Sequence, residues 1–250
     1  MTRAELATFL SAIGIYYAAA YLTAYVCGRL VERYGLKVNY TRKINHLVTI
    51  GAPWLLQQAF RLETNLTAVV LAAILTPCQL LAYVRPVRSR FAFVRTMFRS
   101  FDRPEDRPHT LAWLWTQYVA VYAVYLLIYP LLISREVVAW MTIPIIVNAL
   151  GDGLAEPVGV AFGRHSYRCK AMFSRRRYRR TWEGSACVFL SALVGVLVCR
   201  HTFNDPQFVL AMVFLPLSSA VAEAMSPHTW DAPFLFLVVG GELAALSMVV

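Results

Sequence analysis

The sequence predicts an all-α fold, a polytopic membrane bundle of about seven or eight transmembrane helices. Of the 250 residues, 58% are hydrophobic and 15% are charged, whereas about a quarter of a soluble domain is charged. The apolar residues form long runs, and the mean hydropathy is +0.53. Because backbone groups in lipid must be hydrogen-bonded within the chain, we expect these runs to be helices. Most of the net charge of +10 lies between the runs, which favours a role in topology and contact with anionic lipid or phosphate over nucleic-acid binding.

Eight apolar segments are candidate spans, since a transmembrane helix needs roughly 20 residues. In chain order they cover about residues 5–28, 44–60, 64–84, 110–133, 136–150, 185–203, 207–224 and 232–250. The second and fifth are short, so a tilted, re-entrant or broken helix is the alternative for each. Kinks are expected at prolines within or near the ends of these segments, namely Pro77, Pro130, Pro144 and Pro216.

The basic residues alternate between the two ends of these segments. Of the 24 lysines and arginines, 20 follow the first, third and fifth segments, and four lie at the other ends. The positive-inside rule therefore predicts three cytoplasmic basic connections and both termini on the opposite side. The predicted location is the plasma membrane in a bacterium, or the endoplasmic reticulum or plastid membrane in a eukaryote.

We expect a single membrane-embedded domain over residues 1–250. Its motifs lie in cytoplasmic loops near 29–46, 85–109, 151–184 and 223–231. The connection 85–109 mixes arginine and phenylalanine, so it forms either a basic amphipathic helix on the membrane or a plain topology-setting loop. The five cysteines show no metal-binding spacing, and we expect them to be reduced and structural.

The first polar motif runs from Asn148 to Gly163 and begins at the end of the fifth segment. Asp152 and Glu156 are four residues apart, so they share one face of a helix. Carboxylates at a membrane boundary are costly unless they bind a metal, pair with a cation or face water. Gly151 and Gly153 allow close approach of a phosphate to the backbone. Two further glycines, Gly159 and Gly163, favour a small-residue helix contact instead.

Three further motifs combine cations with acids. The basic tract 164–180 leads into Glu183, which is either a catalytic or ligand-binding acid or a favourable acid at a helix N-terminus. The sequence Arg42-Lys43-Ile-Asn-His46 places two cations and an imidazole on one helix face, with snorkelling anchors as the alternative. The segment 223–231 contains two carboxylates around a proline, and ordinary loop polarity is its alternative reading.

All four motifs fall on the predicted cytoplasmic side, and they are defined by residue type and spacing, independently of the positive-inside rule. The carboxylates that could supply oxygens to Mg²⁺ are Asp152, Glu156, Glu183, Glu223 and Asp231. The groups that could hold phosphates are Arg42, Lys43, Gly151, Gly153, Arg164, Lys170 and Arg180. Phosphoryl transfer depends mainly on positioning and charge stabilisation, which these residue types provide. No P-loop, HExxH or GxSxG motif is present in the sequence.

The order and spacing of these motifs resemble the polyprenol kinase family, which includes dolichol kinase, phytol kinase and the CTP-dependent diacylglycerol kinase. The matching elements are RKxxH, GDGxAExxGxxFG, a basic tract before WEGS, and ExxSPxxxD, within residues 40–235. The chain departs from the family pattern at Asp231-Ala232, where Asp-Asn is common, and at Thr181-Trp182, where Lys-Ser or a similar pair is common. Nucleotide or lipid preference is therefore the property in which this chain is expected to differ.

The resemblance implies a cytoplasm-facing kinase that uses CTP and Mg²⁺ to phosphorylate a lipid alcohol in isoprenoid or phospholipid metabolism. Asp152, Glu183 and His46 are then the catalytic candidates. One alternative is a cytidylyltransferase that forms a CDP-lipid, and a distant one is a non-catalytic lipid-binding or transport protein. The predicted partners are a membrane lipid and a nucleoside triphosphate, without nucleic acid, and the oligomeric state is left open. Glu242, within the last apolar run, pairs with another span or faces a headgroup cavity.

Overall fold

The computed structural model describes residues 2–62, 65–170 and 177–249, and it confirms the all-α prediction. Within these residues the only sheet is a two-stranded β-hairpin. The chain divides into two units, Met1–Val119 and Ala120–Val250, and each is described separately. The prediction of one catalytic domain over the whole chain stays a prediction.

Unit 1 is built from helices and short 3₁₀ turns. Its elements are α1 (Arg3–Tyr34), α2 (Val38–Ala59), α3 (Leu66–Cys78), η1 (Gln79–Tyr83), α4 (Arg85–Arg90), α5 (Ala92–Arg99) and η2 (Pro104–Asp106). The long helix α6 (Thr110–Ser134) begins in this unit. Two of these helices have N-terminal caps of the residue types that favour them: Thr2 and Glu5 form a capping box at α1, and Asn65 caps α3.

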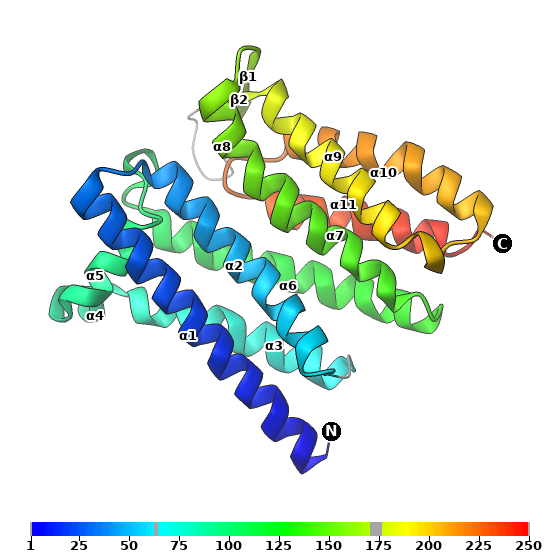
Figure 1. Ribbon diagram of the computed structural model, residues 1–250, viewed down its shortest axis with the longest axis horizontal. Coiled ribbons are helices and arrows are strands. Elements are labelled where there is room, and N and C mark those ends of the chain that lie inside the picture. Colours follow the sequence, from blue (N-terminus) through cyan, green and yellow to red (C-terminus); the bar gives the residue numbers. More distant parts are fainter. Residues whose placement is uncertain (1, 63–64, 171–176, 250) are drawn as a thin grey trace. The chain divides into compact units, whose positions relative to one another are not determined.

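Unit 2 contains a long composite helix, the hairpin and three further helices (Figure 1). The composite helix comprises η3 (Val138–Met141), α7 (Thr142–Ile146), the π-helical turn η4 (Val147–Asp152) and α8 (Gly153–Phe162). The remaining elements are β1 (Ser166–Lys170), β2 (Arg177–Thr181), α9 (Trp182–Val198), η5 (Arg200–Thr202), α10 (Asp205–Met225) and α11 (Asp231–Leu246).

All eight predicted apolar segments coincide with helical regions. Five regions of the described chain are long and apolar enough to cross a membrane: Arg3–Tyr34, Leu66–Tyr83, Thr110–Ser134, Val138–Phe162 and Asp205–Met225. The helix Trp182–Val198 is apolar but shorter, and α2 and α11 lie at the second and eighth predicted segments. The total of seven or eight spans therefore stays a prediction.

The two predicted loops that carry most of the basic residues are largely ordered into helices and strands. The connection 85–109 contains α4, α5 and η2, which favours the amphipathic-helix alternative, although the buried face of α5 packs on protein. The predicted loop 151–184 contains α8 and the hairpin, so the fifth segment extends to Phe162 instead of ending at residue 150. Part of the basic tract, residues 171–176, lies outside the described residues.

An aromatic cluster forms the core of unit 1 where α1, η1 and α5 meet. Tyr83, Phe98 and Phe101 are buried, and their rings contact one another at centroid distances of 5.0 to 6.2 Å. α5 can approach α1 closely because residue 28 is glycine: a β-carbon there would overlap the carbonyl oxygen of Thr96. The five cysteines are free, as predicted.

Candidate functional site

Three of the four polar motifs meet in unit 2, at the ends of α8, α9 and α10. The chain between α10 and α11 lies against the β-hairpin, where the Lys170 carbonyl accepts a hydrogen bond from the His228 backbone N–H at 2.8 Å. The ring of His228 also stacks on Tyr178, with centroids 3.6 Å apart. These contacts bring the segment 223–231 next to the basic tract. Such proximity agrees with the sequence analysis, which places both segments at the same side of the membrane.

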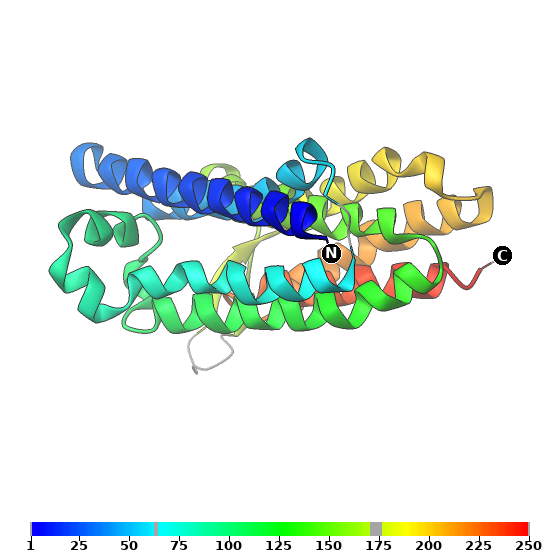
Figure 2. The same cartoon turned by 90° about the horizontal axis from the view of Figure 1, so that it is seen from below.

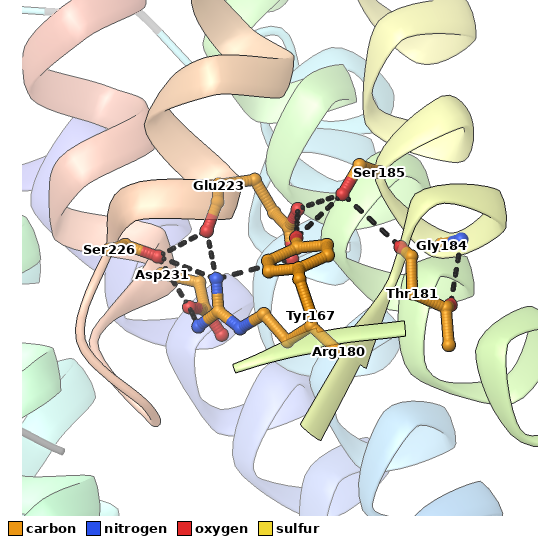
Figure 3. A network of polar contacts seen from close by, with 8 residues as sticks. All are labelled: Tyr167, Arg180, Thr181, Gly184, Ser185, Glu223, Ser226 and Asp231. Carbon is orange, nitrogen blue, oxygen red and sulfur yellow. Dashed lines mark hydrogen bonds and ion pairs between the residues drawn. The ribbon is translucent and has the colours of Figure 1, made fainter. Parts of the chain in front are cut away.

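Arg180, on β2, is the centre of this polar network (Figure 3). Its guanidinium forms an ion pair with Glu223 at 3.2 Å and a shorter one with Asp231. It also donates hydrogen bonds to the Glu223 carbonyl and, at 3.0 Å, to Ser226 Oγ. Burial alone would lower the pKa of Arg180, but the carboxylates of Asp231 and Glu223 more than offset this and raise it. Arg180, which the sequence predicts to bind phosphate, is therefore already paired with two carboxylates.

Glu223 receives a second set of donors from the start of α9 and from β1 (Figure 3). Ser185 Oγ lies 2.6 Å from one carboxylate oxygen, and the Tyr167 hydroxyl donates to that oxygen at 3.2 Å. Burial, followed by the negative charge of Glu223, raises the pKa of Tyr167, so this hydroxyl stays protonated as a donor. Glu223 is thus held by three different elements.

Asp152 lies beside this network at the end of the π-helical turn. It is 4% exposed, and its carboxylate is close enough to Glu223 for an electrostatic interaction. π-helical turns within α-helices are frequent at functional sites. The turn packs tightly on α9, since a β-carbon at Gly151 would overlap Ser191 Oγ. Helix packing therefore accounts for this glycine, and phosphate contact at Gly151 and Gly153 stays a prediction.

The turn after α8 is closed by Glu183, in the first turn of α9. The carboxylate accepts hydrogen bonds from the backbone N–H groups of Arg164 at 3.0 Å and His165 at 3.1 Å. His165 Nδ1 is 3.0 Å from the same carboxylate oxygen. Hydrogen bonds, first from the backbone N–H of Glu183 itself and then from Arg164 and His165, lower the pKa of Glu183 to about 2. The structure thus gives Glu183 a local structural role, while its catalytic and metal-binding roles stay predictions.

The hairpin separates its cations onto two faces. Paired residues of antiparallel strands lie on the same face, and Tyr167 pairs with Arg180 on the face toward the network. On the other face Arg168 pairs with Arg179 and Lys170 pairs with Arg177, and all four are exposed. Within the described residues none of the four forms an ion pair with a carboxylate. This outer cationic face is defined by Arg168, Lys170, Arg177 and Arg179.

The fourth motif lies in unit 1, in the first turns of α2. Arg42, Lys43 and His46 are all within the helix, so the predicted spacing on one face is confirmed. Lys43 is 5% exposed, whereas Arg42 and His46 are partly exposed. Thr41 hydrogen-bonds the Ser100 carbonyl at 2.6 Å, which joins this end of α2 to the end of α5.

The arrangement of acids bears on the predicted Mg²⁺ site. Among the described residues, no three or more histidine, cysteine or acidic side chains are grouped as a metal site would require by itself. Mg²⁺ bound with a nucleotide needs only one or two carboxylates, because phosphates supply further oxygens. Glu223 and Asp231 share the single guanidinium of Arg180, so this trio retains one negative charge and fits a cation held jointly with phosphates.

Several network residues were not individually predicted from the sequence. Tyr167, Ser185 and Ser226 complete the contacts of Glu223 and Arg180. The two serines belong to the WEGS and ExxSPxxxD motifs, so the motifs contained a signal for them. Glu242 pairs with another helix, one of its predicted alternatives: its carboxylate accepts a 2.7 Å hydrogen bond from Ser218 of α10.

Comparison with known proteins gives one informative similarity. The chain is 35% identical over 105 residues to a protein of Synechocystis sp. named phytol kinase. The match covers 41% of this chain and 42% of that protein, so it spans less than half of either. No protein-family model matches the chain. No solved structure matches it. The similarity supports a phytol- or polyprenol-kinase-like relationship over the matched part.

Proposed function

We propose that the protein is a CTP- and Mg²⁺-dependent kinase that phosphorylates a membrane lipid alcohol of the polyprenol, phytol or diacylglycerol type. The observation that carries the proposal is the convergence of three motifs on Arg180 and Glu223, next to Asp152 and on the same hairpin as the outer cationic face. The partial similarity to a phytol kinase supports the same reaction class.

We propose that the outer cationic face attracts the nucleotide triphosphate, which then reacts on the opposite face of the hairpin, beside Asp152, Glu223 and Asp231. Like charges placed directly opposite each other across two strands are destabilising. Arg168 opposite Arg179 and Lys170 opposite Arg177 therefore raise the energy of the unliganded hairpin. A nearby polyphosphate would offset this repulsion, and the four cations would raise the local concentration of CTP.

The reaction requires acceptance of one proton and transfer of one phosphoryl group. The lipid hydroxyl oxygen forms a bond to the γ-phosphorus, and the bond from that phosphorus to the β–γ bridging oxygen breaks, which releases CDP. The hydroxyl proton passes to the Asp152 carboxylate. Glu223 and Asp231 would hold Mg²⁺, which neutralises phosphate charge when bound with the nucleotide.

Labelled nucleotide tests this proposal and separates it from cytidylyl transfer. Purified protein in mixed micelles with Mg²⁺ is given CTP labelled at either the γ- or the α-phosphorus. The substrates are phytol, a polyprenol, diacylglycerol and phosphatidate in separate reactions. Label transferred from the γ position to an alcohol supports the kinase. Transfer only from the α position to phosphatidate, or no transfer from either position, contradicts it.

The Asp152→Asn variant tests the central residue. We expect a loss of transfer of at least about a hundredfold, the scale of removing a general base. The matched control is Asp205→Asn, because Asp205 is an exposed acid at the other end of α10 whose carboxylate pairs with Arg200. Both variants should purify like the parent protein. Full activity of Asp152→Asn would remove this residue from the mechanism.

A further inference from the structure

A second cationic surface lies in unit 1, on α4 and α5. Residues 85–101 contain five arginines and no acidic residue. Two of these arginines are already engaged: Arg99 forms a 2.6 Å ion pair with Glu32, and the Arg88 guanidinium lies 3.7 Å from the centroid of the Phe98 ring. The other three, Arg85, Arg90 and Arg95, are exposed, and in the described part of the chain none of them pairs with a carboxylate.

Two large apolar side chains are exposed among these cations. Phe91 is 43% exposed and Phe93 is 52% exposed, with their rings 5.8 Å apart. The Arg90 guanidinium lies 5.9 Å from the centroid of the Phe91 ring. The opposite face of α5 supplies the packing, because Val94 and Phe98 are buried in the aromatic cluster of unit 1. The two exposed rings are therefore not required by that core. We name this surface, Arg85, Arg90, Phe91, Phe93 and Arg95, the α4–α5 platform.

Chain connectivity places the platform where candidate spans end. Arg85 comes two residues after the end of Leu66–Tyr83. α5 packs on the last turns of α1, where Thr96 Oγ1 donates to Glu32 at 2.9 Å. Figures 1 and 2 both show α4 and α5 beside the C-terminal end of α1. Cations and aromatic rings at the end of a membrane helix lie at the depth of lipid headgroups.

We propose that the α4–α5 platform binds anionic phospholipid headgroups. The guanidinium groups of Arg85, Arg90 and Arg95 contact the phosphates, and Phe91 and Phe93 enter the acyl boundary below them. A soluble polyphosphate would match the charges but would offer no apolar phase to the two rings. The proposal concerns unit 1 alone and is independent of the kinase activity.

The direct test is a titration of purified protein in nonionic detergent with phosphatidylglycerol, with lipid occupancy measured by native mass spectrometry. Each basic residue near an anionic surface contributes about a fivefold change in affinity. The triple variant Arg85→Gln, Arg90→Gln, Arg95→Gln should therefore bind phosphatidylglycerol about a hundredfold more weakly. The affinity for zwitterionic phosphatidylcholine should change little. Unchanged phosphatidylglycerol affinity in this variant would overturn the proposal.

The matched control removes the same charge from exposed arginines at the opposite, extracytoplasmic ends of the predicted spans. It carries Arg3→Gln, Arg61→Gln and Arg135→Gln. This control should retain phosphatidylglycerol affinity within about twofold, whereas an equal loss in both triple variants would indicate a net-charge effect and contradict a defined platform. Both proteins should keep the parent's elution volume in size-exclusion chromatography, because the substituted side chains are exposed.

Two further measurements address the rings and the competing ligand. Phe91→Ser with Phe93→Ser should weaken phosphatidylglycerol binding by about tenfold while leaving the arginines in place. An unchanged affinity would contradict insertion of the rings. Tripolyphosphate is the soluble probe: binding that depends on the same three arginines and excludes phosphatidylglycerol would assign the platform to a soluble anion and overturn the lipid proposal.

Discussion

The two acid-free basic segments, 85–101 and 164–182, have similar compositions but present their cations differently. In the first, a helical period leaves Arg85, Arg90 and Arg95 exposed beside two phenylalanines while Val94 and Phe98 are buried. In the second, a strand period of two turns Arg180 toward two carboxylates and leaves four cations on the outer face. Local backbone conformation therefore decides whether an arginine on such a segment is structural or available to a ligand.

Replacement of Arg180 should change the free energy of unfolding more than any other substitution considered for these two segments. Arg180→Gln leaves the buried Glu223 and the partly buried Asp231 without their cation, and loss of one partner of a buried pair typically costs about 3–5 kcal/mol. The exposed neighbour Arg179 is the control, and Arg179→Gln should change stability by less than about 0.5 kcal/mol. Unfolding in detergent micelles measures both values. Equal effects of the two substitutions would contradict the assignment of opposite faces.

Gly28→Ala should have the next largest effect on the free energy of unfolding, because Gly28 lies where α1 contacts α5 of the segment 85–101. The added β-carbon overlaps a backbone oxygen of Thr96, so α1 and α5 must separate. Overpacking of this kind costs about 1–3 kcal/mol in the free energy of unfolding. Gly14 of the same helix is the control, since a β-carbon added there would meet no atom within 4 Å, and Gly14→Ala should be neutral or stabilising. Similar destabilisation by both would contradict the close helix contact.

Reversal of one charge on the outer face should have opposite effects on stability and on nucleotide use. Arg179→Glu replaces a like-charge pair across the strands with an opposite-charge pair opposite Arg168, which is worth about 0.2–1 kcal/mol. The same change should raise the KM for CTP by about tenfold, because a weaker positive field lowers the local concentration of CTP. Arg179→Gln should give intermediate values. Unchanged KM in both variants would exclude this face from nucleotide binding.

The smallest expected effect concerns acid pH and Glu183. Its folded-state pKa of about 2 lies below the ordinary value of 4.5, so its stabilising contribution is present above pH 4.5. That contribution is lost as pH falls from 4.5 toward 2. Thermal unfolding of the parent protein and of Glu183→Gln at several pH values in this window measures the difference. A gap between the two proteins that stays constant from pH 6 to pH 3 would contradict the lowered pKa.

The positions of the helices could be predicted because apolar runs report directly on burial in lipid. The end of the fifth segment could not, since Asp152, Glu156 and several glycines interrupt the apolar run after Leu150. Packing on α9 keeps these residues helical: Gly151 contacts Ser191, and a β-carbon at Gly184 would lie 2.7 Å from the carbonyl oxygen of Ala155. Such contacts between distant segments are not visible in local periodicity.

The strands of the hairpin were indicated by the sequence pattern, but the many cations in the same segment favoured a loop. Tyr167 and Cys169 alternate with Arg168 and Lys170, a period of two that is typical of a strand. The concentration of cations favours a loop when it is considered alone. The motifs predicted which segments carry polar groups, and the structure adds how they pair: Glu223 with Asp231 around Arg180, and Glu183 with the turn after α8.

The π-helical turn Val147–Asp152 also constrains how this protein can vary in sequence. A π-helical turn is a place where a helix accommodates an extra residue without unfolding. The wider turn absorbs that residue locally, so deletion of one residue within Val147–Asp152 would convert it to an α-helical turn and largely keep the alignment of α8. Deletion of one residue from α8 itself, before Gly159, would instead rotate the rest of α8 by about 100° about its axis and break the contact of Gly159 with Thr181. The π-helical turn is therefore the place in this composite helix where chain length can change while α8 stays aligned with the hairpin.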